Sequence, residues 1–136
     1  LALVLVRAHM RRQGGRATKG DGQLRARARA ALPFALTGAQ EAALGEIIGD
    51  LEGEQRMLRL LQGDVGSGKT VVAALAMLAT AEAGRQSALM APTEILARQH
   101  FATMAPLFEA VGLRLALLTG RDRGAPRRRL LERASL

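Results

Sequence analysis

The chain alternates between stretches in which apolar residues have helical spacing and stretches in which they form short runs. The helical spacing is clearest after Thr37, which forms a capping-box sequence with Gln40 three residues later. The apolar residues that follow share one face of a helix: Leu44, Ile47, Ile48 and Leu51. A second helix is predicted from Lys69, and Gly84 stands where its C-terminal cap belongs. The apolar face of this second helix would hold Val71, Leu75 and Leu78.

Proline and glycine bound the other predicted helices. Thr93 can cap a third helix, which Pro106 kinks or restarts and Gly112 ends. Pro126 lies near the first turn of a fourth helix, over residues 125–134.

The N-terminal quarter of the chain is predicted to be helical with one loop. Residues 1–13 look helical, and the Gly-rich, basic residues 14–22 read as a loop. Residues 24–32 alternate as a strand does, but Ala, Arg and Leu are strong helix formers, so a short helix that ends at Pro33 is favoured.

Three short apolar runs are predicted to be buried strands, over residues 56–62, 87–91 and 113–118. Strand and helix alternate with short connections, which argues for an α/β fold. We therefore expect a parallel sheet with flanking helices and right-handed crossovers, preceded by a short helical segment.

Composition narrows the possible partners. The chain has no cysteine, which excludes disulfides and thiolate metal sites. With 2% aromatic residues, it lacks the side chains that a single-strand platform built on stacked aromatics needs. Its net charge of +8 is concentrated in residues 1–32 and 110–136, whereas residues 33–109 are mildly acidic. Basic ends suit a polyanionic partner, and solvated arginine in an Arg-rich proteome explains them equally well. The apolar start is too short and too interrupted to span a bilayer, so no membrane role is expected.

The most specific motif is "GDVGSGKT", which fits the pattern G-x-x-x-x-G-K-[ST] residue for residue. Its members are Gly63, Asp64, Val65, Gly66, Ser67, Gly68, Lys69 and Thr70. Glycines let backbone N–H groups close around phosphate oxygens, and the following helix presents its unpaired amides to the same anion. Lys69 would reach the β- and γ-phosphates, and the Thr70 hydroxyl would bind Mg²⁺. A predicted strand before the loop and a helix after it favour an ATP site over a plain Gly-rich turn.

Three further stretches extend the motif into a family resemblance: "LPFALTGAQ" before the loop, "APTEILARQH" after the second strand and "LLTG" after the third. The order of these motifs resembles that in the first motor lobe of superfamily 2 helicases. The residues within the motifs are similar to those of the RecG family of bacterial ATP-dependent branch-migration DNA helicases. The resemblance implies a P-loop, RecA-like lobe over residues 33–136, and a basic helical linker from a DNA-binding wedge region over residues 1–32.

The resemblance also implies roles for individual residues. Gln40 would read the adenine edge, with helix capping as the alternative or additional role, and Phe34 would stack on the base or serve as a core anchor. Thr93, Thr119 and Gly120 match motifs that touch the DNA backbone, with capping and a loop turn as their alternatives.

The resemblance makes equally clear what the sequence lacks. No acidic Walker B strand is visible, and the second motor lobe, its arginine finger and the wedge are absent from the sequence. The chain has no initiator Met and stops within a predicted helix, so we expect part of a longer, cytoplasmic bacterial protein that binds branched or forked DNA. Alone it should hydrolyse little ATP.

Two alternatives and two minor interpretations remain. Another superfamily 2 translocase, of the transcription-repair or primosome type, is one alternative, and an unrelated P-loop ATPase such as a small-molecule kinase is the other. Met77, Met90 and Met104 are interpreted as core filler, and His100 as a structural histidine.

Overall fold

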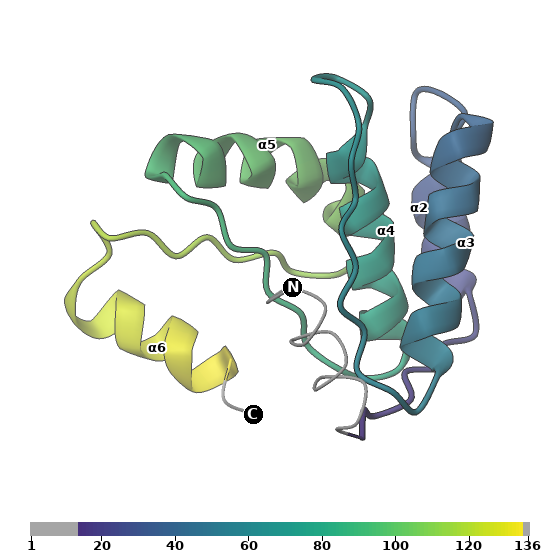
Figure 1. Cartoon of the computed structure of the whole chain (residues 1–136). Coiled ribbons are helices and arrows are strands. Elements are labelled where there is room, and N and C mark those ends of the chain that lie inside the picture. The colour runs from purple at the N-terminus through teal and green to yellow at the C-terminus, as the bar shows by residue number, and fades with distance from the viewer. Residues whose placement is uncertain (1–13, 135–136) are drawn as a thin grey trace, which may run out of the picture.

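The computed structural model of the chain describes residues 14–134, and Figure 1 shows their arrangement. The helix predicted over residues 1–13 lies outside this part. The helices of the described part are α2 (Gln23–Ala30), α3 (Gly38–Glu52), α4 (Lys69–Glu82), α5 (Glu94–Ala110) and α6 (Gly124–Ala134). Every helix predicted within residues 14–134 is therefore confirmed, and so is the loop over residues 14–22, which contains a single bridge residue.

Local side-chain chemistry explains where the helices begin. The Thr37 hydroxyl accepts the Gln40 N–H at 3.3 Å, and the Gln40 carboxamide accepts the Thr37 N–H at 2.9 Å, which is the predicted capping box. The Thr93 hydroxyl caps α5 by accepting the Leu96 N–H at 3.3 Å.

Glycines in the left-handed region end α4 and α5, as predicted. Gly84 has φ +69° and Gly112 has φ +77°, and in each case the next residue donates its N–H to a carbonyl in the last turn. Helix α5 runs through Pro106 as one element, so the predicted restart there is wrong. The surrounding residues Met104, Leu107 and Phe108 are buried, and their packing offsets the backbone hydrogen bond that proline cannot donate.

Helix α4 forms the centre of the core. Its residues Leu75 and Leu78 are fully buried, and α4 packs against α2, α3 and α5 (Figure 1). The predicted faces are confirmed, because Leu44 and Ile47 of α3 belong to the same apolar cluster. Helix α6 packs against none of the other described helices. The nucleotide motif that precedes α4 is thus carried by the best-buried helix of the described part.

The short helix α2 is fastened to the far end of α4. The Glu82 side chain, which is fully buried, accepts the backbone N–H of Gly22 at 3.1 Å and of Arg25 at 2.8 Å. It also accepts the Arg25 Nε–H at 2.8 Å. Gly22, the N-cap residue of α2, has no side chain to act as a cap. Glu82 therefore supplies an acceptor from α4, in addition to Asp21, which accepts the Gln23 N–H at 3.0 Å. No Cβ would fit at Gly20, because Glu82 lies against it.

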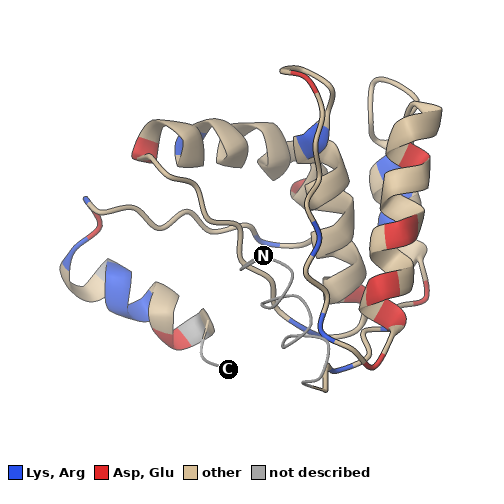
Figure 2. Cartoon of the chain, viewed as in Figure 1, with Lys and Arg blue, Asp and Glu red and all other residues tan. Residues whose placement is uncertain are grey.

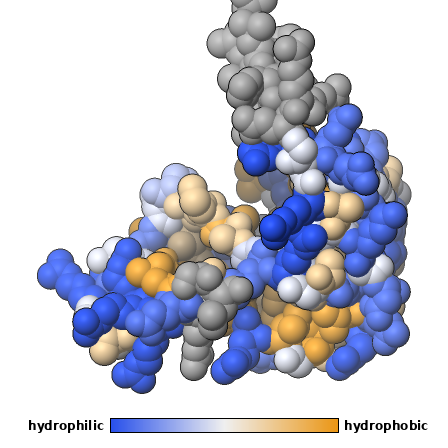
Figure 3. Space-filling model, turned by 90° about the horizontal axis from the view of Figure 1, so that it is seen from below, coloured by the Kyte–Doolittle hydropathy of each residue, from blue (hydrophilic) through white to orange (hydrophobic). Residues whose placement is uncertain are grey.

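The three predicted strands do not form a sheet within residues 14–134. Residues 56–62, 87–91 and 113–118 have no ladder partner there, and the described part has one isolated antiparallel bridge, between Gly14 and Gln55. A strand needs a neighbour whose backbone groups face its own, and these segments have none among the described residues. Some of their apolar residues are exposed, among them Leu60, Met90 and Leu118, whereas Leu61, Leu113 and Leu115 pack against the core. Figure 3 shows that one face of the molecule carries apolar patches.

Exposure of these segments also corrects one interpretation of the methionines. Met104 is buried and Met77 packs against the core, as predicted. Met90, in the segment 87–91, is 91% exposed, so its assignment as core filler is wrong for the described structure.

Charge is distributed unevenly over the elements. Figure 2 shows acidic residues along α3 and basic residues on α6. Within the described residues, no helix is long and apolar enough to cross a membrane.

Candidate nucleotide-binding site

The loop 63–68 arches over the N-terminus of α4 (Figure 1). Gly66 and Gly68 have φ +81° and +79°, a region that side chains with a Cβ rarely adopt. Gly68 is the N-cap residue of α4 and offers no side-chain cap. Among the described residues, the backbone N–H groups of Gly66, Gly68, Lys69 and Thr70 have no hydrogen-bond acceptor. Unpaired amides at the positive end of a helix form a site for an anion.

Close contacts show why the loop needs glycine. A Cβ on Gly63 would lie 2.6 Å from the Ser67 hydroxyl, and a Cβ on Gly68 would overlap the Gln40 carboxamide. The loop is therefore wrapped tightly, and neither glycine leaves room for a Cβ. Such a backbone cradle fits a nucleotide phosphate.

Lys69 supplies the positive charge of this cradle. Its ammonium donates to the carbonyl of Gly63 at 2.7 Å and of Asp64 at 2.6 Å, and lies 3.4 Å from the Ser67 hydroxyl. These bonds hold the side chain folded into the loop, beside the free amides. A phosphate bound in the loop could therefore replace the loop carbonyls as the hydrogen-bond acceptor of this ammonium.

Gln40 links α3 to the loop. Besides capping α3 through its carbonyl oxygen, it donates from Nε2 to the Ser67 carbonyl at 2.8 Å. The capping alternative for Gln40 is therefore present in the structure, and a second contact, to the loop, was not predicted. Phe34 is 53% exposed, so it is not the core anchor that was one of its two interpretations.

The hydroxyl of Thr70, the predicted Mg²⁺ ligand, lies 3.4 Å from Nδ1 of His100 on α5. Mg²⁺ commonly takes one or two protein ligands and completes its shell with phosphate oxygens and water. One half-buried hydroxyl beside a phosphate cradle fits that role. No cluster of three or more His, Cys, Asp or Glu that could hold a metal by itself occurs within residues 14–134.

A second group of predicted site residues follows the strand-like segments 87–91 and 113–118. Thr93 is exposed at the N-terminus of α5, whereas Thr119 is buried and donates its hydroxyl to Asp122 at 2.9 Å. Asp122 also accepts the Thr119 N–H at 2.6 Å. These hydrogen bonds, the backbone one first, lower the pKa of the Asp122 carboxyl, with Arg98 and Arg127 adding to the effect. The loop turn proposed as an alternative role for this segment is present.

An ion pair joins the start of α5 to the turn that contains Thr119 and Gly120. Arg121 lies 3.3 Å from Glu94, the residue that follows Thr93, and Glu94 also pairs with Arg98. The exposed Gly120 lies between Thr119 and Arg121. Pattern reasoning missed Glu94, Arg121 and Asp122, although an acid directly after a capping threonine is a recognisable first-turn residue.

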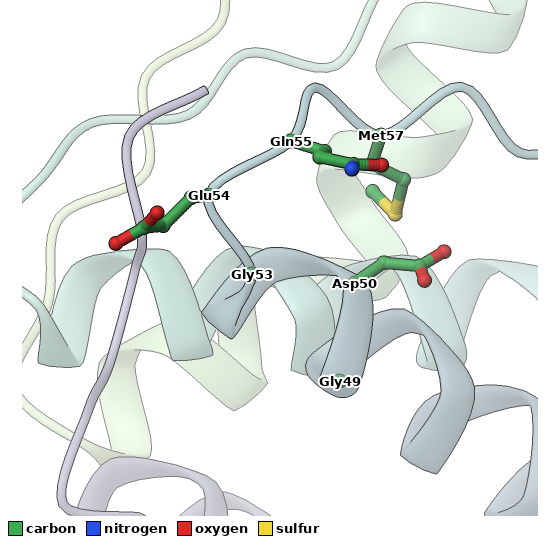
Figure 4. Close-up of a pocket in the computed structure, with 6 residues that line it drawn as sticks. All are labelled: Gly49, Asp50, Gly53, Glu54, Gln55 and Met57. Atoms are coloured by element: carbon green, nitrogen blue, oxygen red, sulfur yellow. The ribbon is translucent and has the colours of Figure 1, made fainter. Parts of the chain in front are cut away.

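Two hollows of the described surface lie beside α3 and the segment that follows it. One, of about 330 Å³, is lined at the end of α3 by Gly49, Asp50 and Gly53 and by the segment that follows (Figure 4). Another, of about 400 Å³, lies between α3 and residues 59–62. Neither contains a residue of the phosphate motif. The loop is an open cradle, and the chemistry of its amides identifies it better than its depth does.

A glycine loop of this geometry before a central helix defines a P-loop NTPase. The family model for "DEAD/DEAH box helicase" matches residues 37–136. Among curated proteins, "ATP-dependent DNA helicase RecG" of Streptococcus pneumoniae is 60% identical over 101 residues, which are 74% of this chain and 15% of that protein. The Bacillus subtilis protein of the same name is 55% identical over 102 residues, again 15% of its length.

One solved structure, "Structure of RecG bound to three-way DNA junction", is also similar. It superposes with a TM-score of 0.83 at 40% identity and covers 97% of this chain and 18% of that one. The chain belongs to the DEAD/DEAH box helicase family. The resemblance to the RecG family is confirmed, and the chain spans about 15% of the length of the curated relatives that it matches.

Proposed function

We propose that this chain binds ATP and Mg²⁺ as the nucleotide-binding part of a DNA helicase that couples ATP hydrolysis to branch migration and fork regression. The unpaired amides of the loop before α4, with the Lys69 ammonium beside them, carry the proposal. The relatives named as ATP-dependent DNA helicases support it. Because such a motor works on chromosomal DNA, its place in a bacterium would be the cytoplasm.

Within this function, residues 63–70 hold the phosphates, with Thr70 as the Mg²⁺ ligand. Phe34 and Gln40 face the adenine. The exposure of Phe34 supports a stacking role, and one Nε2 hydrogen of Gln40 remains beyond the bond to Ser67. Bound Mg²⁺ would neutralise charge on the β- and γ-phosphates.

Thr93, Thr119 and Gly120 form the DNA-facing side of the proposal. The ion pair between Glu94 and Arg121 supports it, because it holds these two loops next to each other. Thr93 is exposed and can reach a phosphate directly, whereas Thr119, whose hydroxyl is bonded to Asp122, acts by shaping the turn around Gly120.

The larger architecture is part of the same proposal. Residues 1–32 would be a linker, and residues 33–136 the first part of a RecA-like lobe. Segments 56–62, 87–91 and 113–118 would join a parallel sheet completed by chain beyond this sequence. Their exposed apolar residues, among them Leu60 at 78%, support this. The wedge region and second motor lobe would belong to the same protein.

The test uses a full-length protein that contains this chain. Unwinding of a three-way DNA junction and ATP hydrolysis are measured with and without Lys69→Ala. We expect the junction to stimulate hydrolysis and the variant to lose both activities. Hydrolysis that a junction does not stimulate would disprove the helicase proposal, and junction unwinding that survives Lys69→Ala would disprove the assignment of the loop.

A further inference from the structure

Helix α5 contacts both proposed sites. Thr93 is its N-cap residue, and His100, about two turns further on, contacts the hydroxyl of Thr70 at the start of α4. His100 is half-buried, and its Nδ1 lies 3.4 Å from the Thr70 hydroxyl oxygen. This contact joins residues 30 positions apart, and binding of phosphate by the loop does not require it.

The chemistry of a metal-bound hydroxyl indicates which of the two groups donates the hydrogen bond and which accepts it. A threonine hydroxyl donates one hydrogen bond and has two lone pairs. To bind a cation it must turn a lone pair toward the metal, and its hydrogen then needs an acceptor elsewhere. A neutral histidine whose ring proton is on Nε2 offers Nδ1 as that acceptor. Partners of this kind, which hold a ligand in orientation, tune metal affinity.

We propose that His100 is a positioning residue, whose Nδ1 accepts a hydrogen bond from the Thr70 hydroxyl and so orients the lone pairs of this hydroxyl toward Mg²⁺. Through α5 it also ties DNA contact at Thr93 to metal binding at Thr70. The inference rests on the proposed function, because it takes Thr70 as a magnesium ligand and Thr93 as a DNA contact.

Packing explains how α5 can transmit a displacement. Its buried residues Met104, Leu107 and Phe108 seat the C-terminal half of the helix in the core, whereas its N-terminal turn is exposed. Thr93 and His100 lie about 10 Å apart along the axis. A hydrogen bond of 3.4 Å is at the long end of the useful range, so a small shift of the helix strengthens or breaks it. Binding of DNA and of Mg²⁺ would then each favour the other, since such coupling is reciprocal.

The test measures ADP affinity of the full-length protein with and without Mg²⁺, so that the ratio reports the magnesium contribution independently of turnover. His100→Leu should lower this ratio about tenfold. His100→Asn should restore it, because the Asn carbonyl oxygen can occupy the place of Nδ1. His100→Gln, whose carboxamide reaches the place of Nε2, should not restore it. ADP affinity without Mg²⁺ serves as the reference for an intact site in every variant.

Adding three-way junction DNA extends the test to coupling. DNA should raise the magnesium ratio in the wild type and leave it unchanged in His100→Leu. Thr70→Val separates the inference from the function on which it rests. If Thr70→Val lowers the ratio while His100→Leu keeps the wild-type value, the role of His100 is wrong and that of Thr70 stands. If Thr70→Val itself has no effect, the proposed magnesium site is wrong. A DNA effect that persists in His100→Leu would overturn the coupling.

Discussion

Lys69 is the residue whose loss should cost the most activity. Its ammonium is folded into the phosphate loop, where it meets the carbonyls of Gly63 and Asp64. In hydrolysis it would face phosphate charge that grows in the transition state. We therefore expect Lys69→Ala to reduce ATP turnover of the full-length protein at least about a hundredfold. Lys19, exposed in the loop before α2, is a matched control, and Lys19→Ala should keep wild-type turnover. Equal turnover in the two variants would contradict the assignment of Lys69 as a ligand of the ATP phosphates.

Gln40 caps α3 and bonds to the phosphate loop, and substitutions can separate these two contacts from its proposed role in reading adenine. If its carboxamide reads adenine, Gln40→Ala should weaken ADP more than GDP, by about 1–3 kcal/mol, measured by calorimetry. Gln40→Glu keeps the oxygen that caps α3 but cannot donate to Ser67 or to a base acceptor. It should therefore lose the preference for adenine while keeping the cap. Equal weakening of both nucleotides by Gln40→Ala would assign Gln40 to capping and loop support alone.

Among single residues, those in contiguous motifs could be predicted and those in distant contacts could not. The capping role of Gln40 follows from its spacing to Thr37, three residues away. Its bond to Ser67 and the contact of His100 with Thr70 join residues 27 and 30 positions apart. Such contacts depend on how α3 and α5 pack on α4, and no local pattern encodes that packing.

At the scale of elements, the attachment of α2 to α4 depends on one buried carboxylate. Glu82 accepts the backbone N–H groups of Gly22 and Arg25 and pairs with the Arg25 side chain. Removing a buried acceptor leaves its donors unsatisfied, which costs about 1–3 kcal/mol. In Glu82→Ala we expect the amides of Gly22 and Arg25 to exchange with solvent at least about fivefold faster, measured by hydrogen exchange. Glu109→Ala, an exposed change on α5, should leave their exchange as in the wild type. Unaltered exchange in Glu82→Ala would show that α2 is held by apolar packing instead.

The turn 119–122 should respond to acid through Asp122. Hydrogen bonds from the Thr119 N–H and hydroxyl favour the charged carboxylate and lower its pKa below the ordinary value. A carboxylate with a lowered pKa stabilises the fold above its unfolded pKa, near 3.9, and this contribution disappears as the pH falls through the folded value. The Thr119 amide resonance should therefore titrate with a midpoint below the ordinary aspartate pKa. A midpoint at or above that value would contradict the hydrogen-bonded turn. In Asp122→Asn this titration should vanish.

Helices were predictable from the sequence because their determinants are local. Thr37, Thr93, Gly84 and Gly112 mark helix ends by interactions within a few residues, and each does so in the structure. The strands could not be confirmed in the same way. A run such as residues 87–91 becomes a strand only when another segment pairs with it, and the described residues provide none.

At the scale of the whole molecule, α3 and α6 differ in charge, and this difference indicates which of the two would face DNA. Acidic residues lie on α3, whereas arginines lie on α6, a separate element (Figure 2). Arg59 forms ion pairs with Glu46 and Asp50 of α3, so its positive charge is compensated and is not free for a phosphate. Helix α6 packs on no other described helix, and Arg128 and Arg129 are exposed on it. This arrangement favours α6 over α3 as a surface for phosphate.

Salt dependence distinguishes DNA contact by α6 from simple solvation of its arginines. We expect the variant with Arg127, Arg128 and Arg129 all changed to Gln to bind duplex DNA with a smaller slope of log affinity against log salt. Each lost phosphate contact should reduce the slope by up to about 0.9. Arg127 should contribute least, because it is half-buried and already near the Asp122 carboxylate. Arg59→Gln, which removes an acid-paired arginine, should keep the wild-type slope. The weakening should be similar for unrelated DNA sequences, because phosphate contacts carry no base information. An unchanged slope in the triple variant would return these arginines to an ordinary solvated helix face.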